Sequence, residues 1–135
     1  SVGILALFFG ITAPKSNTLD FDYPCNPHLT SQFAINHSAD TELIVATAGE
    51  RIYVCRVKLL SRGTVNVGFI YGTGTVCATG LTLMEGAQAL TAQVGYIDAP
   101  DGVWKTAAGN ALCLDVSAAV EVDGYIVYRK MVDPY

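Results

Sequence analysis

The chain has 135 residues, a length that suits one domain with a real core and is short for two. Hydrophobic residues make up 51% and charged residues 15%, and the formal net charge of −4 includes only eight scattered basic residues, which excludes the basic stripe that follows a nucleic-acid backbone. No continuous apolar run reaches the length of about 18 residues that a membrane span requires, so we expect neither a nucleic-acid nor a membrane partner.

The apolar excess therefore needs another explanation. The mean hydropathy of +0.37 is high for a protein that stays single in water. We interpret it as surface that is covered by other protein chains, and we expect a homo-oligomer, a dimer or a trimer.

Residues 1–31 are predicted to form an extended N-terminal arm. The first thirteen, SVGILALFFGITA, are similar to a signal-peptide core but lack a basic start, and we expect them to persist in the mature protein. Residues 14–27 contain three prolines and many turn formers, which hold a chain extended. We expect the arm to lie in a groove on a neighbouring subunit or to add a strand to its sheet, and an ordinary first strand of the same domain is the alternative. The candidate partner-binding residues are Ile4, Leu5, Leu7, Phe8, Phe9 and Ile11.

Residues 32–135 are predicted to form an all-β domain, either a β-sandwich or a jelly roll. Apolar residues alternate with a period of two in 51–59, 64–70 and 119–128, a pattern typical of half-buried strands. In the first of these segments strict alternation places Ile52, Val54 and Arg56 on one face and Tyr53, Cys55 and Val57 on the other.

Turn signals recur every eight to twelve residues, the spacing expected of a sandwich or jelly roll. We expect a hairpin-like turn at Arg62–Gly63, a loop of small residues at 72–80 and a tight turn at Asp98–Gly102. A short helix over 83–92 is an alternative to a strand there, although Gly86 weakens it. The expected strands are 32–36, 42–46, 50–61, 64–71, 81–84, 87–92, 94–97, 103–106, 111–116 and 119–131.

The sequence contains no pattern that predicts a catalytic residue, a cofactor site or a metal site. His28 and His37 lack the spacing of zinc ligands, and no Gly-x-Ser-x-Gly elbow is present. Gly72-Thr-Gly74 is half of a dinucleotide-binding fingerprint without its helix, and Asp98 and Asp101 lack a calcium-loop spacing. We therefore expect no enzyme, no cofactor and no metal ion.

The four cysteines have no CxxC spacing, which gives no support to a zinc ribbon or a thioredoxin-type site. Cys55 and Cys113 lie within strand patterns, and we interpret each as a free, buried thiol. Cys77 lies in a Gly-rich loop, where we expect it to be accessible, and the redox state of Cys25 and Cys77 stays open. A domain of this size can build a core without disulfide bonds, which argues against a disulfide framework.

A series of turn-rich segments carries a family resemblance: residues 48–55 (AGERIYVC), 63–67 (GTVNV), 71–80 (YGTGTVCATG), 90–92 (LTA) and 107–114 (AAGNALCL), followed by SAAV at 117–120. With these segments, residues 41–130 resemble small virion proteins of tailed bacteriophages, in particular capsid decoration (cement) proteins and related β-sandwich modules.

The resemblance implies a jelly-roll-like structural protein on the capsid exterior, assembled in the host cytoplasm. Such a protein binds the major capsid protein and ties neighbouring capsomers together. A tail-associated module that recognises host glycans is the alternative, and Trp104 and Tyr96, which flank the Asp-Gly loop, are the candidates for its sugar-binding platform.

Overall fold

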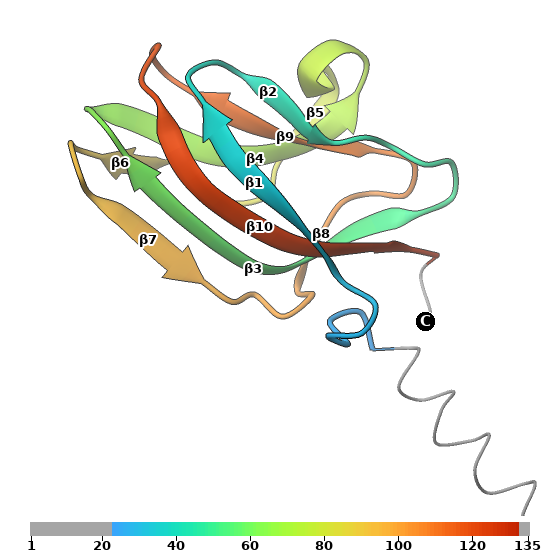
Figure 1. The fold of residues 1–135 in the computed structure, drawn as a ribbon. Helices are drawn as coiled ribbons and strands as arrows, with labels where there is room; N and C mark the ends of the chain where they lie inside the picture. The colour runs from blue at the N-terminus through green and yellow to red at the C-terminus, as the bar shows by residue number, and fades with distance from the viewer. Residues whose placement is uncertain (1–22, 133–135) are drawn as a thin grey trace, which may run out of the picture.

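Two antiparallel β-sheets, packed face to face, make up the part of the chain that the structure describes, residues 23–132 of a computed structural model (Figure 1). The predicted all-β sandwich is confirmed. One helical turn, η1 (Thr75–Cys77), lies between two strands of the second sheet. The first sheet contains β1 (Ser31–His37), β10 (Val122–Met131), β3 (Arg51–Ser61), β7 (Gly95–Asp98) and β8 (Trp104–Lys105); the second contains β2 (Thr41–Ile44), β9 (Ala111–Val116), β4 (Val65–Thr73), β5 (Thr79–Leu83) and β6 (Gln88–Leu90).

The strand order is that of a jelly roll. The first sheet runs β1-β10-β3-β7, with β8 also paired to β3, and the second runs β2-β9-β4-β5, with β6 also paired to β4. Consecutive strands therefore change sheets at six steps: β1–β2, β2–β3, β3–β4, β6–β7, β8–β9 and β9–β10. This interleaving of the chain between two facing sheets characterises the jelly-roll form of the sandwich.

Because β3 and β4 lie in different sheets, the prediction of a hairpin-like turn at Arg62–Gly63 is wrong. The segment is a crossing between sheets, and the Arg62 N–H donates to the Glu121 carbonyl at 3.0 Å. A Cβ atom on Gly63 would lie 3.0 Å from a methyl carbon of Val120, so the crossing packs closely against the start of β10.

The core lies between the sheets and consists of the inward residues of their strands. Successive strand residues point to opposite faces, which is why the period of two in the sequence predicts these strands well. The largest fully buried core side chains are Ile35, Ile52, Leu59, Phe69, Leu112, Leu114 and Ile126.

Strict alternation fails in the middle of β3. The pairing of β3 with β10 shifts between Val127 and Tyr128, whose partners are Arg56 and Val54, so that Cys55 is an extra residue. Such a bulge moves all later side chains to the opposite face. Val57 accordingly lies in the core on the same side as Val54, and not on the face of Cys55 as predicted.

The helix considered for residues 83–92 is absent, since this segment contains the end of β5, a bend and β6. The predicted loop at 72–80 is more ordered than expected, because β4 continues to Thr73 and η1 and the start of β5 follow. Within residues 23–132, no helix is long and apolar enough to span a membrane.

Candidate functional site

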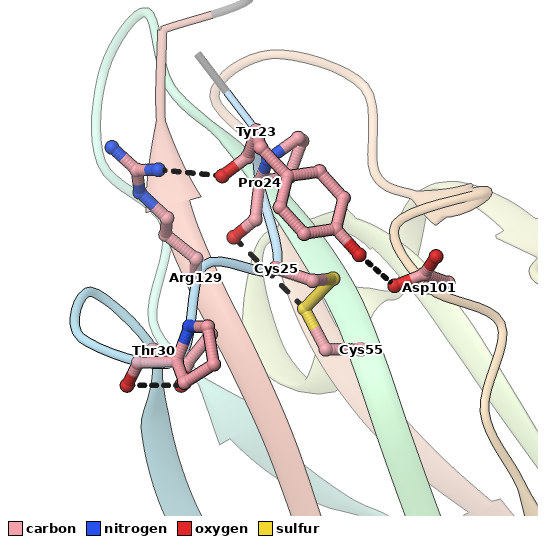
Figure 2. The surroundings of a disulfide bond; sticks show 8 residues. Tyr23, Pro24, Cys25, Thr30, Cys55, Asp101 and Arg129 are labelled. Atoms are coloured by element: carbon pink, nitrogen blue, oxygen red, sulfur yellow. Dashed lines mark hydrogen bonds between the residues drawn. A yellow bond between two sulfur atoms is a disulfide. The ribbon is translucent and has the colours of Figure 1, made fainter. Parts of the chain in front are cut away.

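Residues 23–30, here called the strap, cross the outer face of the first sheet before β1 begins (Figure 2). Two successive turns shape the strap: the Asn26 N–H donates to the Tyr23 carbonyl at 3.3 Å, and the Leu29 N–H donates to the Asn26 carbonyl at 2.9 Å. The Asn26 side chain accepts a further bond from the His28 N–H at 3.0 Å. Prolines and an Asn at turn positions are the residue types that favour this local structure.

A disulfide bond joins the strap to the sheet. Cys25 is bonded to Cys55, with 5.6 Å between their Cα atoms (Figure 2). The interpretation of Cys55 as a free thiol is therefore wrong. Alternation from Ile52 and Val54 places Cys55 on the outer face, where the strap covers it and leaves 9% of it exposed.

Two polar contacts hold Tyr23, the first described residue, close to this disulfide bond. The Tyr23 hydroxyl donates to the Asp101 carboxylate, and Arg129 on β10 donates from Nη1 to the Tyr23 carbonyl at 3.1 Å (Figure 2). The hydrogen bond to Asp101, with smaller effects of burial and of the nearby negative charge, raises the pKa of Tyr23. The strap is thus tied to β3, to β10 and to the loop after β7.

The loop that receives Tyr23 is the tight turn predicted at Asp98–Gly102. It is bound to β3, since the Gly102 N–H donates to the Val54 carbonyl at 2.9 Å. A Cβ atom on Gly102 would lie 3.4 Å from Pro24 Cβ and 3.5 Å from Cys25 Sγ, so the loop and the strap are in direct contact.

A second disulfide bond lies on the outer face of the second sheet. Cys77 in η1 is bonded to Cys113 on β9, and both residues are fully buried together with Ile70 and Ala111. The expectations of an accessible Cys77 and of a free Cys113 are wrong. An even number of cysteines was the available signal, but their spacing did not reveal which strands would be neighbours.

Large apolar side chains are exposed beyond the strap. On the outer face of the first sheet, Leu60 is 42% exposed and Ile97 on β7 is 59% exposed. Gly95 pairs with Leu60, and a Cβ atom there would lie 1.9 Å from the Leu59 carbonyl oxygen, so this position has no room for a side chain. We call Leu60, Gly95 and Ile97 the β7 patch. A hollow of about 550 Å³ at the patch is lined by Lys58, Leu59, Leu60, Gly95, Tyr96 and Ile97.

The edge strand of the second sheet carries a comparable pair of apolar side chains. Leu81 and Leu83 on β5 are 51% and 58% exposed. Since β5 and β7 belong to different sheets, the two exposed regions are separate surfaces.

The polar residues considered for chemistry lie apart from one another. His28 is in the strap and His37 ends β1. Among residues 23–132, no group of three or more His, Cys, Asp or Glu side chains is placed to hold a metal ion. Asp101 is engaged by Tyr23, and Asp98 ends β7.

A more polar hollow lies next to the β7 patch, and its one basic residue is paired with two carboxylates. Its lining includes Arg62 and Asp123. The Nε atom of Arg62 lies 2.6 Å from a carboxylate oxygen of Glu121 and 2.6 Å from one of Asp123. Such a cluster holds the crossing between the sheets.

Trp104 and Tyr96 do not form an exposed platform. Both are partly buried against the main core, and the Trp104 and Phe69 rings are 6.4 Å apart with a tilt of 44°. The Tyr96 hydroxyl donates to Glu85 at 3.3 Å, and burial, together with that carboxylate, raises the pKa of Tyr96. The geometry therefore does not favour the glycan-binding hypothesis.

The candidate arm residues Ile4, Leu5, Leu7, Phe8, Phe9 and Ile11 lie outside the described residues.

Comparisons with known proteins give no family. No family model and no curated protein matches the chain. A crystal structure of PirA is similar over 76% of this chain and 93% of its own, with 11% identity and a TM-score of 0.33. A chain of the T13 viral particle of IBDV is similar over 76% of this chain, with 9% identity and a TM-score of 0.36, and this chain spans 31% of its length. Likenesses this distant carry no argument about function.

Proposed function

We propose that this protein is a non-enzymatic structural component of a phage virion, which decorates the capsid exterior and stabilises it by bridging neighbouring capsomers. Its partners are the major capsid protein and further copies of itself. The body sits on one capsomer, and the arm, through Ile4, Leu5, Leu7, Phe8, Phe9 and Ile11, grips a neighbouring subunit. The sequence resemblance over residues 41–130 and the apolar excess of the chain support this proposal.

The anchored strap is the observation that carries the proposal. A segment that merely connects two parts of a protein needs no fixed position, yet here a covalent bond from Cys25 to Cys55 fixes the start of the described chain to the body. The hydrogen bonds of Tyr23 with Asp101 and Arg129 hold the same point from two further elements. An arm with such a base begins at a defined place and direction, which suits repeated contacts over a lattice, where modest individual affinities combine.

The two disulfide bonds support the position on the exterior. Disulfides persist outside the reducing cytoplasm, and thiols stay reduced within it. A protein that joins the capsid in the host cytoplasm would therefore carry four thiols at first. Its disulfide bonds would form once the particle is released.

The fold by itself does not decide the function, because jelly rolls occur in capsid proteins, lectins and cupins alike. The proposal assigns no catalytic step to the chain. It rests on the anchored base and the exposed apolar edges.

The test measures binding of the purified protein to capsids that lack it. The intact chain should bind and raise the temperature at which the capsids release DNA, and deletion of residues 1–13 should weaken binding at least about tenfold. Val103→Ser, at a body position that is 79% exposed, is the control and should bind as the intact chain does. Failure of the intact chain to bind would refute the decoration role, and full binding by the truncated chain would refute the role of the arm.

A further inference from the structure

We infer that the β7 patch is the receptor for the arm of a second copy of this chain, and that residues 4–11 of that copy add a strand to the free edge of β7. The inference rests on the proposed function in that it assigns a partner to the same arm residues. Copies of the decoration protein would then bind one another as well as the capsid.

The edge of β7 is open to an added strand. Among the described residues β7 pairs with β3 alone, on one side. An edge strand presents unpaired backbone N–H and C=O groups on its other side, and an extended peptide can pair with them whatever its side chains are. Figure 1 shows β7 at the margin of its sheet.

The side chains beside this edge match the arm. Ile97 and Leu60 are exposed on the outer face, and both line the hollow. The run SVGILALFFGITA has no charged residue, and in a strand its odd positions put four large apolar side chains on one face. These four side chains, which would cover the patch, are Leu5, Leu7, Phe9 and Ile11.

The strap and the β7 patch lie on the same face. Cys55 and Arg129, which hold the strap, point outward from the first sheet, as Leu60 and Ile97 do. The strap of each copy thus covers one end of this face, and the arm of a second copy would cover the next part.

The length of the arm allows it to reach a second copy. Ile97 is four positions from Asp101, which binds Tyr23, so the chain's own patch begins within about 14 Å of the loop that holds the strap. Twelve positions separate Ile11 from Tyr23, and an extended spacer of that length reaches about 40 Å. A spacer of this length therefore allows the apolar run to extend beyond its own patch to that of a neighbour, as the inference requires.

Photo-crosslinking without capsids tests the inference. Benzoylphenylalanine replaces Phe9 in the full chain, and equal amounts of ¹⁴N- and ¹⁵N-labelled protein are mixed before irradiation. We expect peptides that join position 9 to residues 95–98 or 58–60, half of them with one light and one heavy partner. Crosslinks within one isotope only would mean that each arm folds onto its own body, and crosslinks to β5 would mean a different receptor; either result overturns the inference.

A matched pair of substitutions gives an independent test. Ile97→Lys and Leu83→Lys change two edge residues that are 59% and 58% exposed, so neither should disturb the core. In sedimentation equilibrium, Ile97→Lys should raise the dissociation constant of self-association at least about tenfold, and Leu83→Lys should leave it within about twofold. Equal effects of the two, or a wild-type chain that is monomeric at every concentration, would overturn the inference.

These results separate the inference from the proposed function. Capsid binding by the intact chain without arm-to-β7 crosslinks would refute only the inference. If copies of the chain crosslink to one another but do not bind capsids, only the decoration role is refuted.

Discussion

Cys55 is the residue of the body to which the strap is covalently bound, because its sulfur is bonded to that of Cys25, 30 positions earlier in the chain. Alternation along β3 turns Cys55 out of the core, and the bulge at Cys55 returns Val57 to it. The outward position of one strand residue thus determines where the N-terminal segment is fixed.

Removing this bond by a Cys25→Ser/Cys55→Ser double substitution should lower the free energy of unfolding by about 3–4 kcal/mol, because the unfolded chain regains the entropy of a long loop. The measurement is urea denaturation. The matched control is Cys77→Ser/Cys113→Ser, whose loop of 36 positions is similar to the 30 of the first bond, so loop entropy alone predicts nearly equal losses.

The two double substitutions should nevertheless differ in their effect on the arm. Only loss of the Cys25–Cys55 bond should weaken capsid binding, since the second disulfide lies on the other sheet. Equal losses of binding in two equally folded variants would contradict the anchoring role of the strap.

Half-buried Glu85 should make the protein less stable as the pH rises. Burial is the main cause that raises the pKa of Glu85, and the charge of Asp98 adds to it, although the Tyr96 hydrogen bond opposes the shift. A raised folded-state pKa means that the folded state holds the proton more tightly. The stabilisation from this group is complete below the ordinary glutamate pKa of 4.5 and is lost as the pH rises through the folded-state value.

Glu85→Gln keeps an acceptor for Tyr96 and removes the titration. The variant should therefore gain stability relative to the wild type as the pH rises from 4 to 7, measured by urea denaturation at each pH. Glu42→Gln, an exposed position on β2, serves as the control and should follow the wild type. A constant difference between Glu85→Gln and the wild type at all pH values would contradict the assignment.

Trp104→Ala should destabilise the body, because Trp104 packs on Phe69 and the core. We expect a loss of about 3 kcal/mol, somewhat below that for a fully buried tryptophan. Val103→Ala, at the 79% exposed neighbour, should change stability by less than about 0.5 kcal/mol. A stable Trp104→Ala protein that has lost binding to a glycan array would instead revive the sugar-binding hypothesis.

Gly124 is the third residue of β10 and has a φ of +155°, and a Cβ atom there would lie 1.8 Å from the Lys58 carbonyl oxygen. Gly124→Ala should therefore cost about 2–4 kcal/mol through backbone strain and overpacking. Gly86→Ala, where nothing lies within 4 Å of the new atom, should be neutral or slightly stabilising in the same thermal or urea denaturation. Similar losses for both variants would contradict the close approach of β10 to β3.

The sequence predicts the strands well because each buries one face, and alternating side chains report that burial directly. It does not predict the partner of a strand. The turn at Arg62–Gly63 has the length of a hairpin, yet the apolar faces of β3 and β4 are better buried against each other, so the chain crosses between sheets there. For the same reason neither disulfide bond was predicted, because each joins residues that are far apart in the sequence.

The sequence left the location of Tyr96 and Trp104 open for a different reason, because each combines an apolar ring with one polar group. Tyr96 and Trp104 flank a turn, which is equally compatible with a surface platform and with core packing at a strand end. Only the placement of Phe69 and Glu85 beside them decides the question. The β7 patch had no sequence signal of its own, because Leu60 and Ile97 read as ordinary strand residues.

A mechanical consequence follows from the position of Cys55. The residue belongs to a central strand, with β10 on one side and β7 and β8 on the other. Tension on the arm enters the body at this strand. Extraction of the strand would require rupture of the hydrogen bonds to its neighbours on both sides. Resistance to pulling is set by the rate of forced unfolding, not by equilibrium stability. A pull on the arm would therefore first meet a strand that is held by neighbours on both sides.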